Sequence, residues 1–273
     1  MLDKLHLRSN IHIDDSTLNK LFMSGCFTKF KIRVSGFNNS YVINKSGNHL
    51  MTIKRDPWLD RCWKTYIELN PNSFKKHNNL LGFLDKLKAN LNSYEIRRID
   101  HCADMNIPIG LIRDSLIVKH KVKRTDYEAR DNISGMYFGK NNEVIAIYNK
   151  KLQLKDKKKI FIKLDCTRFE VRQYKKKINH TSLFSLDKFL NENPFKSLLF
   201  SNIDINEHDP KTLNLRDRVF LEQVNQSGLH SAYKVFNTNS NFKRNFGKHL
   251  TETNYGEEIL SKYHQGLKEY LDE

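Results

Sequence analysis

Apolar and polar residues alternate in several short segments of the first two thirds of the chain, with the two-residue period of β-strands. In Trp63–Leu69, for example, every second residue from Trp63 onward would face the same side of a sheet. The strands predicted in this way are Leu2–Arg8, Trp63–Leu69, Glu95–Met105, Leu116–Lys123, Gly135–Phe138, Glu143–Asn149 and Ile160–Arg172. A turn at Gly139–Asn142 would join two of them as a hairpin.

Other segments show the helical period of 3.6 residues. In Phe74–Leu91 leucines recur at helical spacing, which predicts a face that packs in the core. The other predicted helices are Asp14–Ser24 and, after Gln173, Leu183–Asn191, Lys211–Asn225, Asn239–Leu250 and Gly256–Leu271. Ser35–Asn48 is expected to be a turn around a short strand, and Lys150–Lys159 a basic connector.

These elements predict an α+β fold, a central and mainly antiparallel sheet with helices on one face, followed by a helical C-terminal region. The change from strand to helix patterns places a boundary near Lys177–Thr181. Residues 1–177 would then form the main domain, and residues 178–273 the C-terminal region.

The chain carries 47 Lys and Arg against 31 Asp and Glu, a net charge of +16. Such a surplus attracts polyanions, and phosphate contacts by Lys and Arg supply most sequence-independent affinity for nucleic acids. A nucleic-acid partner is therefore favoured, with a merely solvated basic surface as the alternative. No basic amphipathic helix or lipidation motif indicates a membrane partner.

The cysteines lie far apart, without the spacing of a zinc site, so they are expected to be buried and reduced. They are Cys26, Cys62, Cys102 and Cys166. The first residues lack the apolar core of a signal peptide, and no apolar run approaches the length of a spanning helix. We expect a soluble, cytoplasmic protein.

Three predicted strands carry a carboxylate directly after a large apolar residue: Glu68, Asp100 and Glu170. If these strands share a sheet, the carboxylates share a face, and a hard divalent cation such as Mg²⁺ or Mn²⁺ would offset their repulsion. Asp104 could support the site from the same strand face as Asp100. The alternative is that the carboxylates pair with nearby arginines in an ion network. Those arginines are Arg98, Arg168 and Arg172.

Tyr148 ends the predicted strand Glu143–Asn149 and precedes Lys150 and Lys151. A phenol has an ordinary pKa of about 10 and is a weak nucleophile at neutral pH, but a metal and cations nearby favour the phenolate. The alternative is a tyrosine whose ring is packed and whose hydroxyl faces water.

Four stretches in order resemble the rolling-circle replication initiators of filamentous phages (the gene II/X family) and of small plasmids (the Rep_trans family). They are Tyr66-Ile-Glu-Leu-Asn-Pro-Asn72, Arg98-Ile-Asp-His-Cys-Ala-Asp104, Tyr137-Phe-Gly139 leading to Ile145-Ala-Ile-Tyr-Asn-Lys-Lys151, and Thr167-Arg-Phe-Glu-Val-Arg172. The opening Met1–Arg8 is similar to the phage type, and the resemblance covers about Met1–Lys177. It implies a Rep-like, HUH-nickase-like fold, although the His-hydrophobic-His metal motif of many such nickases is missing here.

The resemblance implies that Tyr148 is the nicking nucleophile and that Lys151 assists it. It assigns the metal site to Glu68, Asp100 and Glu170. Lys150, Arg168 and Arg172 are candidate DNA contacts. The expected function is a metal-dependent nickase that starts rolling-circle replication through a phosphotyrosine intermediate.

The implied partners are single-stranded or hairpin origin DNA and a host helicase and polymerase, with a homodimer as a possible assembly. A phage-encoded protein of this kind would act in the host cytoplasm. Two alternative functions stay open, a relaxase or transposase with the same chemistry and a DNA-binding regulator without catalysis.

Overall fold

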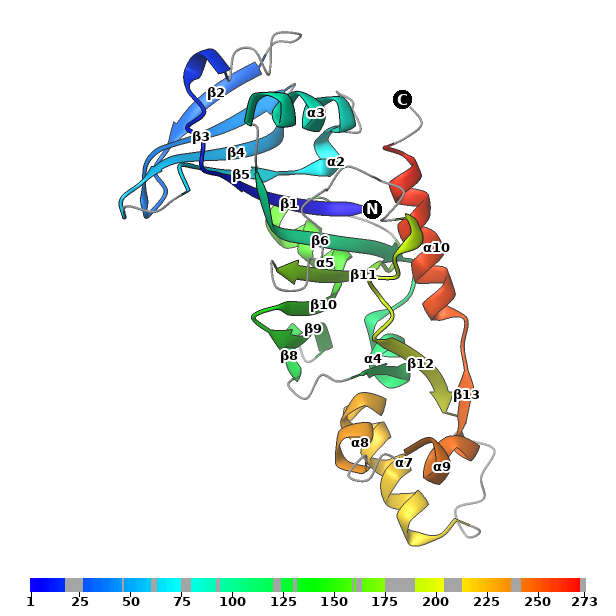
Figure 1. The fold of residues 1–273 in the computed structure, drawn as a ribbon. Helices are drawn as coiled ribbons and strands as arrows, with labels where there is room; N and C mark the ends of the chain where they lie inside the picture. Colours follow the sequence, from blue (N-terminus) through cyan, green and yellow to red (C-terminus); the bar gives the residue numbers. More distant parts are fainter. Residues whose placement is uncertain are drawn as a thin grey trace.

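The computed structural model describes residues 1–273 apart from 18–26, 46, 60–62, 75–79, 92–93, 120–123, 130–131, 159, 161–163, 175–189, 204–212, 237–241 and 271–273. Its centre is a ten-stranded sheet in which all neighbours run antiparallel, in the order β2-β3-β4-β5-β1-β6-β11-β10-β9-β8 (Figure 1). The strands are β1 (Leu2–Ser9), β2 (Phe27–Ile32), β3 (Phe37–Lys45), β4 (Asn48–Pro57), β5 (Thr65–Leu69), β6 (Glu95–Met105), β8 (Arg124–Ala129), β9 (Asn132–Lys140), β10 (Glu143–Asn149) and β11 (Thr167–Tyr174).

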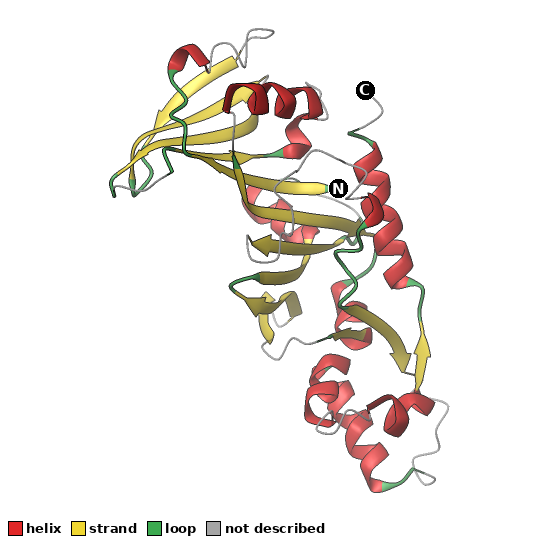
Figure 2. Ribbon diagram, in the orientation of Figure 1, coloured by secondary structure: helices red, strands yellow, loops and turns green. Residues whose placement is uncertain are grey.

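A second sheet has three strands, in the order β13-β12-β7. These are β7 (Leu116–Val118), β12 (Leu198–Ile203) and β13 (Leu250–Glu252). The helices are α2 (Pro71–Phe74), α3 (Leu80–Leu91), α4 (Ile109–Ser115), α5 (Lys150–Lys158), α7 (Leu215–Ser227), α8 (Leu229–Phe236), α9 (Phe242–Phe246) and α10 (Tyr255–Lys268), with a 3-10 turn η2 (Gly247–His249). Figure 2 shows the strands extending from the upper left through the middle of the molecule, with helices beside them and at the lower end.

One face of the large sheet is apolar because alternate strand residues point toward it. In β5, Ile67 and Leu69 are buried while Glu68 between them is half-exposed. This apolar face packs against buried residues of α2, α3, α4 and α10, such as Phe74 and Leu84. Helices α7, α8 and α9 form a separate small core at the far end of the molecule from β2 (Figure 1). The predicted α+β class with its antiparallel sheet is confirmed.

Several local predictions need correction. Residues Lys150–Lys158 form helix α5 and not a connector. The helix was not predicted because its sequence is too polar to show an apolar period. Strand β11 begins at Thr167, not at Ile160. Strand β3 spans nine residues, more than the short strand predicted within Ser35–Asn48. The C-terminal part also contains strands β12 and β13.

The division into residues 1–177 and 178–273 stays a prediction, and its boundary at Lys177–Thr181 lies outside the described residues, as does most of the predicted helix Leu183–Asn191. Cys102 is buried and Cys166 half-buried, both as free thiols, whereas Cys26 and Cys62 lie outside the described residues. Among the helices of the described residues, none combines the length and apolar character needed to traverse a lipid bilayer.

Candidate active site

Four predicted site residues lie on the polar face of the sheet, on β5, β6, β10 and β11. Residues directly opposite each other in an antiparallel pair point to the same face. Glu68 and Arg98 both lie opposite His6, on the two strands that flank it, so they point to the same face. Asp100 is two residues after Arg98 and shares this face. Asp100 lies opposite Arg172, two residues after Glu170. Tyr148 of β10 lies opposite Arg168, two residues before Glu170, so the shared face inferred from alternation is present.

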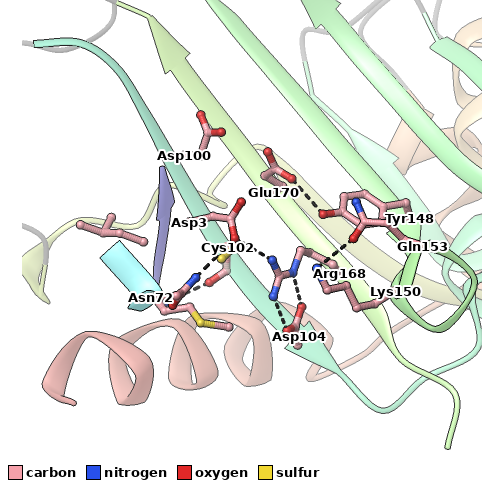
Figure 3. A network of polar contacts seen from close by, with 12 residues as sticks. Asp3, Asn72, Asp100, Cys102, Asp104, Tyr148, Lys150, Gln153, Arg168 and Glu170 are labelled. Carbon is pink, nitrogen blue, oxygen red and sulfur yellow. Dashed lines mark hydrogen bonds and ion pairs between the residues drawn. The ribbon is translucent and has the colours of Figure 1, made fainter. Parts of the chain in front are cut away.

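Three carboxylates converge on this face: Asp3, Asp100 and Glu170. One oxygen from each lies within 4.8 Å of the others. Asp100 is fully buried and Glu170 is 3% exposed. Figure 3 shows the three side chains next to one another on one face of the sheet.

Asp3 joins the cluster because of a β-bulge in β1. Leu2 pairs with His101 and Lys4 with Asp100, so one extra residue of β1 is accommodated between these two pairs. A bulge places two consecutive side chains opposite one partner residue and re-aims them. The sequence analysis missed Asp3, although Leu2, Leu5 and Leu7 carry a signal for it. Their unequal spacing interrupts the two-residue period just at Asp3.

Each carboxylate of the cluster is also bound by an arginine. Arg98 binds Asp100 through two nitrogens, with Nε donating at 2.6 Å. Arg172 Nε donates to Glu170 Oε1 at 2.6 Å, and Arg168 Nη1 donates to Asp3 Oδ1 at 2.8 Å. The structure therefore contains an arginine–carboxylate ion network, which was the alternative to a metal site.

Arg168 connects the cluster to Asp104. Its Nε and Nη2 donate to the two oxygens of Asp104, both at 2.6 Å, while its third nitrogen binds Asp3 (Figure 3). The Arg168 side chain is 6% exposed. Its guanidinium thus positions Asp3, and little of it remains accessible to a DNA phosphate.

The turn that follows α10 supports the segment that carries Asp3. The hydroxyl of buried Tyr270 lies 3.0 Å from the carbonyl oxygen of Leu2 and 3.2 Å from Oδ1 of Asn72. Asn72 Nδ2 in turn lies 3.4 Å from Asp3 Oδ1. The bulged segment of β1 is therefore held by residues distant in sequence.

Tyr148 lies at the edge of the cluster. Its hydroxyl donates to Glu170 Oε2 at 3.2 Å, and its side chain is 8% exposed. Burial, followed by the charge of Glu170, raises the pKa of Tyr148 well above that of a free phenol. The tyrosine is therefore held in its protonated form in this arrangement.

The two buried carboxylates of the cluster have opposite pKa shifts. Burial raises the pKa of Asp100 to about 6, with the Arg98 ion pair opposing the shift and the nearby Glu170 charge adding to it. Burial acts in the same direction on Glu170, but the contacts with Arg172, Tyr148 and Arg168 together outweigh burial and lower its pKa. Near neutral pH both groups can act as anionic ligands.

The two lysines after Tyr148 are placed differently. Lys150 Nζ lies 5.9 Å from the centre of the Tyr148 ring and donates to Gln153 at 2.9 Å. Burial, followed by the charge of Arg168, lowers the pKa of Lys150. Lys151 Nζ instead lies 3.4 Å from Asp165 Oδ1. The structure therefore brings Lys150 close to Tyr148 and pairs Lys151 with Asp165.

Glu68 shares the polar face but does not belong to the three-carboxylate cluster. Its carboxylate binds Lys54 and lies 3.8 Å from His6 Nδ1. Burial raises the pKa of Glu68, but its hydrogen bond with Lys54 and the charges around it lower the pKa, with a net decrease. Asp3 occupies the place in the cluster that the sequence analysis gave to Glu68.

The donor set of the cluster fits a hard divalent cation. Oxygen ligands lie about 2.0–2.6 Å from Mg²⁺ or Ca²⁺, so opposite ligands of one ion are up to about 5 Å apart. A carboxylate offers about four lone-pair sites, so an arginine bond leaves sites for a metal. Hydrogen bonds from surrounding groups to ligating carboxylates are usual in metal centres. Asp3, Asp100 and Glu170 could thus hold a divalent cation.

Comparisons with known proteins bear on the fold alone. No protein-family model and no curated protein matches the chain. A solved structure described as a rolling-circle replication initiator protein from Geobacillus stearothermophilus matches with a TM-score of 0.52 and 14% sequence identity, over 85% of this chain and 98% of that one. This chain has the fold of a rolling-circle replication initiator. The matched 85% of this chain is longer than residues 1–177, so the initiator-like fold extends into the C-terminal part. The narrower likeness to the phage gene II/X family stays a prediction.

Proposed function

We propose that the protein is a metal-dependent DNA strand nickase and strand-joining enzyme that initiates rolling-circle replication. One observation carries the proposal. The Tyr148 hydroxyl is bonded to Glu170, a member of a buried three-carboxylate cluster, at 3.2 Å in an initiator-like fold. A hydroxyl nucleophile is activated by an adjacent base or a metal, and the hydrogen bond to Glu170 places Tyr148 beside both a base and a candidate metal ligand.

In the proposed reaction the Tyr148 oxygen attacks the scissile phosphorus and its proton passes to Glu170. The new bond joins Tyr148 to the 5′ phosphate, and the broken bond releases the 3′ oxygen, which takes up the proton from Glu170 to become a hydroxyl. A divalent cation held by Asp3, Asp100 and Glu170, Mg²⁺ or Mn²⁺, would polarise the phosphate and stabilise its developing charge. Attack by a 3′ hydroxyl on the phosphotyrosine reverses these steps and reseals the strand.

The proposed substrate is single-stranded or hairpin origin DNA. The net charge of +16 favours a polyanion, and Lys150 and half-buried Arg172 lie on the same face as Tyr148. The freed 3′ hydroxyl would prime a host polymerase, with a host helicase opening the duplex. A relaxase or transposase would use the same residues for strand transfer.

A DNA-binding regulator without catalysis is the second candidate. The observation that favours it is the pairing of each cluster carboxylate with an arginine, because such a network can be purely structural. In that case the arginines neutralise the carboxylates and no cation is needed.

The two candidates differ in a covalent product. Wild-type protein is incubated with Mn²⁺ and a single-stranded DNA pool of random sequence, then denatured and separated on a gel. The nickase predicts a protein–DNA adduct that Tyr148→Phe abolishes and Tyr174→Phe, a change at the exit of β11, retains. DNA binding without any adduct favours the regulator and contradicts the nickase.

A further inference from the structure

We propose that Tyr127 and Tyr137 form a binding site for an unpaired nucleobase of the strand being cut, beside Tyr148. The inference rests on the proposed function, since it assigns a base-binding role next to the proposed nucleophile. It concerns the end of the sheet formed by β8 and β9 (Figure 1).

Strand pairing aligns the two tyrosines with the candidate active site. Tyr127 of the outermost strand lies opposite Gly135, and Gly135 lies opposite Tyr148. Two strand spacings, about 10 Å, therefore separate the backbone of Tyr127 from that of Tyr148. Tyr137 lies opposite Ala146, which lies opposite Glu170. Both tyrosines are thus next to the proposed reaction centre.

Gly135 of β9 lies between Tyr127 and Tyr148 in the sheet and has no side chain. A Cβ atom at this position would lie 3.4 Å from the Tyr148 Cβ and 3.5 Å from Cε2 of the Tyr137 ring. The Tyr137 ring therefore packs close to the Gly135 backbone, in the space that a larger side chain would take. The glycine thus allows the Tyr137 ring to lie directly beside Tyr148.

The aromatic pair is built for contact with a flat ring. The rings of Tyr127 and Tyr137 lie 5.0 Å apart in an edge-to-face arrangement, and Tyr127 is 52% exposed. The Arg172 guanidinium lies 5.8 Å from the Tyr137 ring. Bases stack on exposed aromatic rings irrespective of sequence, and arginine contributes to such sites.

The surroundings of Tyr127 argue for a base instead of a protein partner. Its neighbours on β8, Thr125, Asp126 and Glu128, are polar and exposed, so the described side chains that flank the ring on this strand form no apolar patch. Protein docking surfaces typically contain contiguous apolar area, whereas a base needs one or two rings.

The test measures binding without metal, so that no strand is cut. Fluorescence anisotropy compares a labelled single strand of mixed sequence, about 20 nucleotides long, with the same backbone carrying abasic sites in place of bases. We expect Tyr127→Ala combined with Tyr137→Ala to weaken binding of the mixed strand by about tenfold and to leave binding of the abasic strand unchanged. Tyr127→Phe should bind like wild type.

Phe30→Ala provides a matched control. Phe30 is equally exposed, 52%, but belongs to β2 at the opposite edge of the sheet. It should not change the preference for the mixed strand. If the double variant lost equal affinity for the mixed and the abasic DNA, or lost affinity for neither, the base site would be overturned. Tyr127→Ala alone, at an exposed position, keeps the test valid if the double variant fails to fold.

Failure of the base site and failure of the proposed function give different results. A protein that prefers strands with bases, yet forms no adduct with Mn²⁺, contradicts the nickase and leaves the base site standing. A protein that forms the adduct but shows the same preference in wild type and in Tyr127→Ala contradicts the base site only.

Discussion

Tyr148 donates a hydrogen bond to Glu170 at 3.2 Å, and the other oxygen of the same carboxylate accepts from Arg172 at 2.6 Å. Both contacts favour an ionised Glu170 and a protonated Tyr148, whose pKa is raised by burial and by the Glu170 charge. The arrangement therefore represents a resting state of the proposed site. Attack by Tyr148 requires that charge in the cluster be redistributed before the phenol can lose its proton.

Replacing Asp3 should remove metal binding, whereas replacing Glu68 should not. Asp3 lies in the three-carboxylate cluster and Glu68 is paired with Lys54 outside it. We expect Asp3→Asn to weaken Mn²⁺ binding by at least about tenfold, the scale of losses seen even for residues that only support a ligand. Calorimetric titration with Mn²⁺ measures this directly.

Glu68→Gln is the matched control, since it removes one carboxylate from the same face. Its Mn²⁺ affinity should equal that of the wild type. Loss of binding in Glu68→Gln with retention in Asp3→Asn would restore Glu68 as the ligand and reject Asp3.

Metal affinity should depend on pH through Asp100. Burial raises the pKa of Asp100 to about 6, so below pH 6 a cation must displace its proton. The affinity for Mn²⁺ should therefore fall by about tenfold per pH unit below 6 and change little above 7. Titrations between pH 5 and 8 test the prediction, and an affinity that stays constant from pH 5 to 7 or decreases toward pH 7 speaks against it.

Arg168 should matter for stability more than for DNA affinity. Arg168→Ala leaves Asp3 and Asp104 without their shared partner, and removing one member of a buried ion pair costs about 3 kcal/mol. Chemical denaturation gives the free energy of unfolding. Lys29→Ala, which breaks an exposed pair with Asp15, should cost less than about 1 kcal/mol. Similar small losses for both variants would mean that Arg168 does not hold the site together.

Lys150 should assist the reaction of Tyr148 more than Lys151 does. Lys150 Nζ lies 5.9 Å from the centre of the Tyr148 ring, whereas Lys151 pairs with Asp165. We expect Lys150→Ala to slow adduct formation by about tenfold or more, since a nearby cation favours the phenolate. Lys151→Ala should have a small effect, and the reverse order of rates would support the assignment of Lys151 made from the sequence.

Alternation along strands was sufficient to predict much of this architecture. It located β1, β5, β6, β10 and their polar face, because a side chain's face in a strand follows from counting by two. It also indicated that Asp100, Tyr148 and Glu170 share one face if their strands share a sheet. Alternation does not specify that β6 pairs with β11, so neither the close approach of Asp100 to Glu170 nor the Arg168–Asp104 bridge follows from it.

Other features were lost where the local pattern is weak or interrupted. The bulge that brings Asp3 into the cluster breaks the period that strand prediction relies on. Helix α5 is so rich in lysine that no apolar face marks it. Strand β13, with three residues, is too short to show a period at all.

Mapping the covalent adduct tests the central claim most directly. Protein reacted with Mn²⁺ and single-stranded DNA is digested with protease and nuclease, and the peptide that retains a nucleotide is sequenced by mass spectrometry. The account predicts a nucleotide attached through a 5′ phosphate to Tyr148. Attachment to any other residue, or the same adduct in Tyr148→Phe, would contradict it.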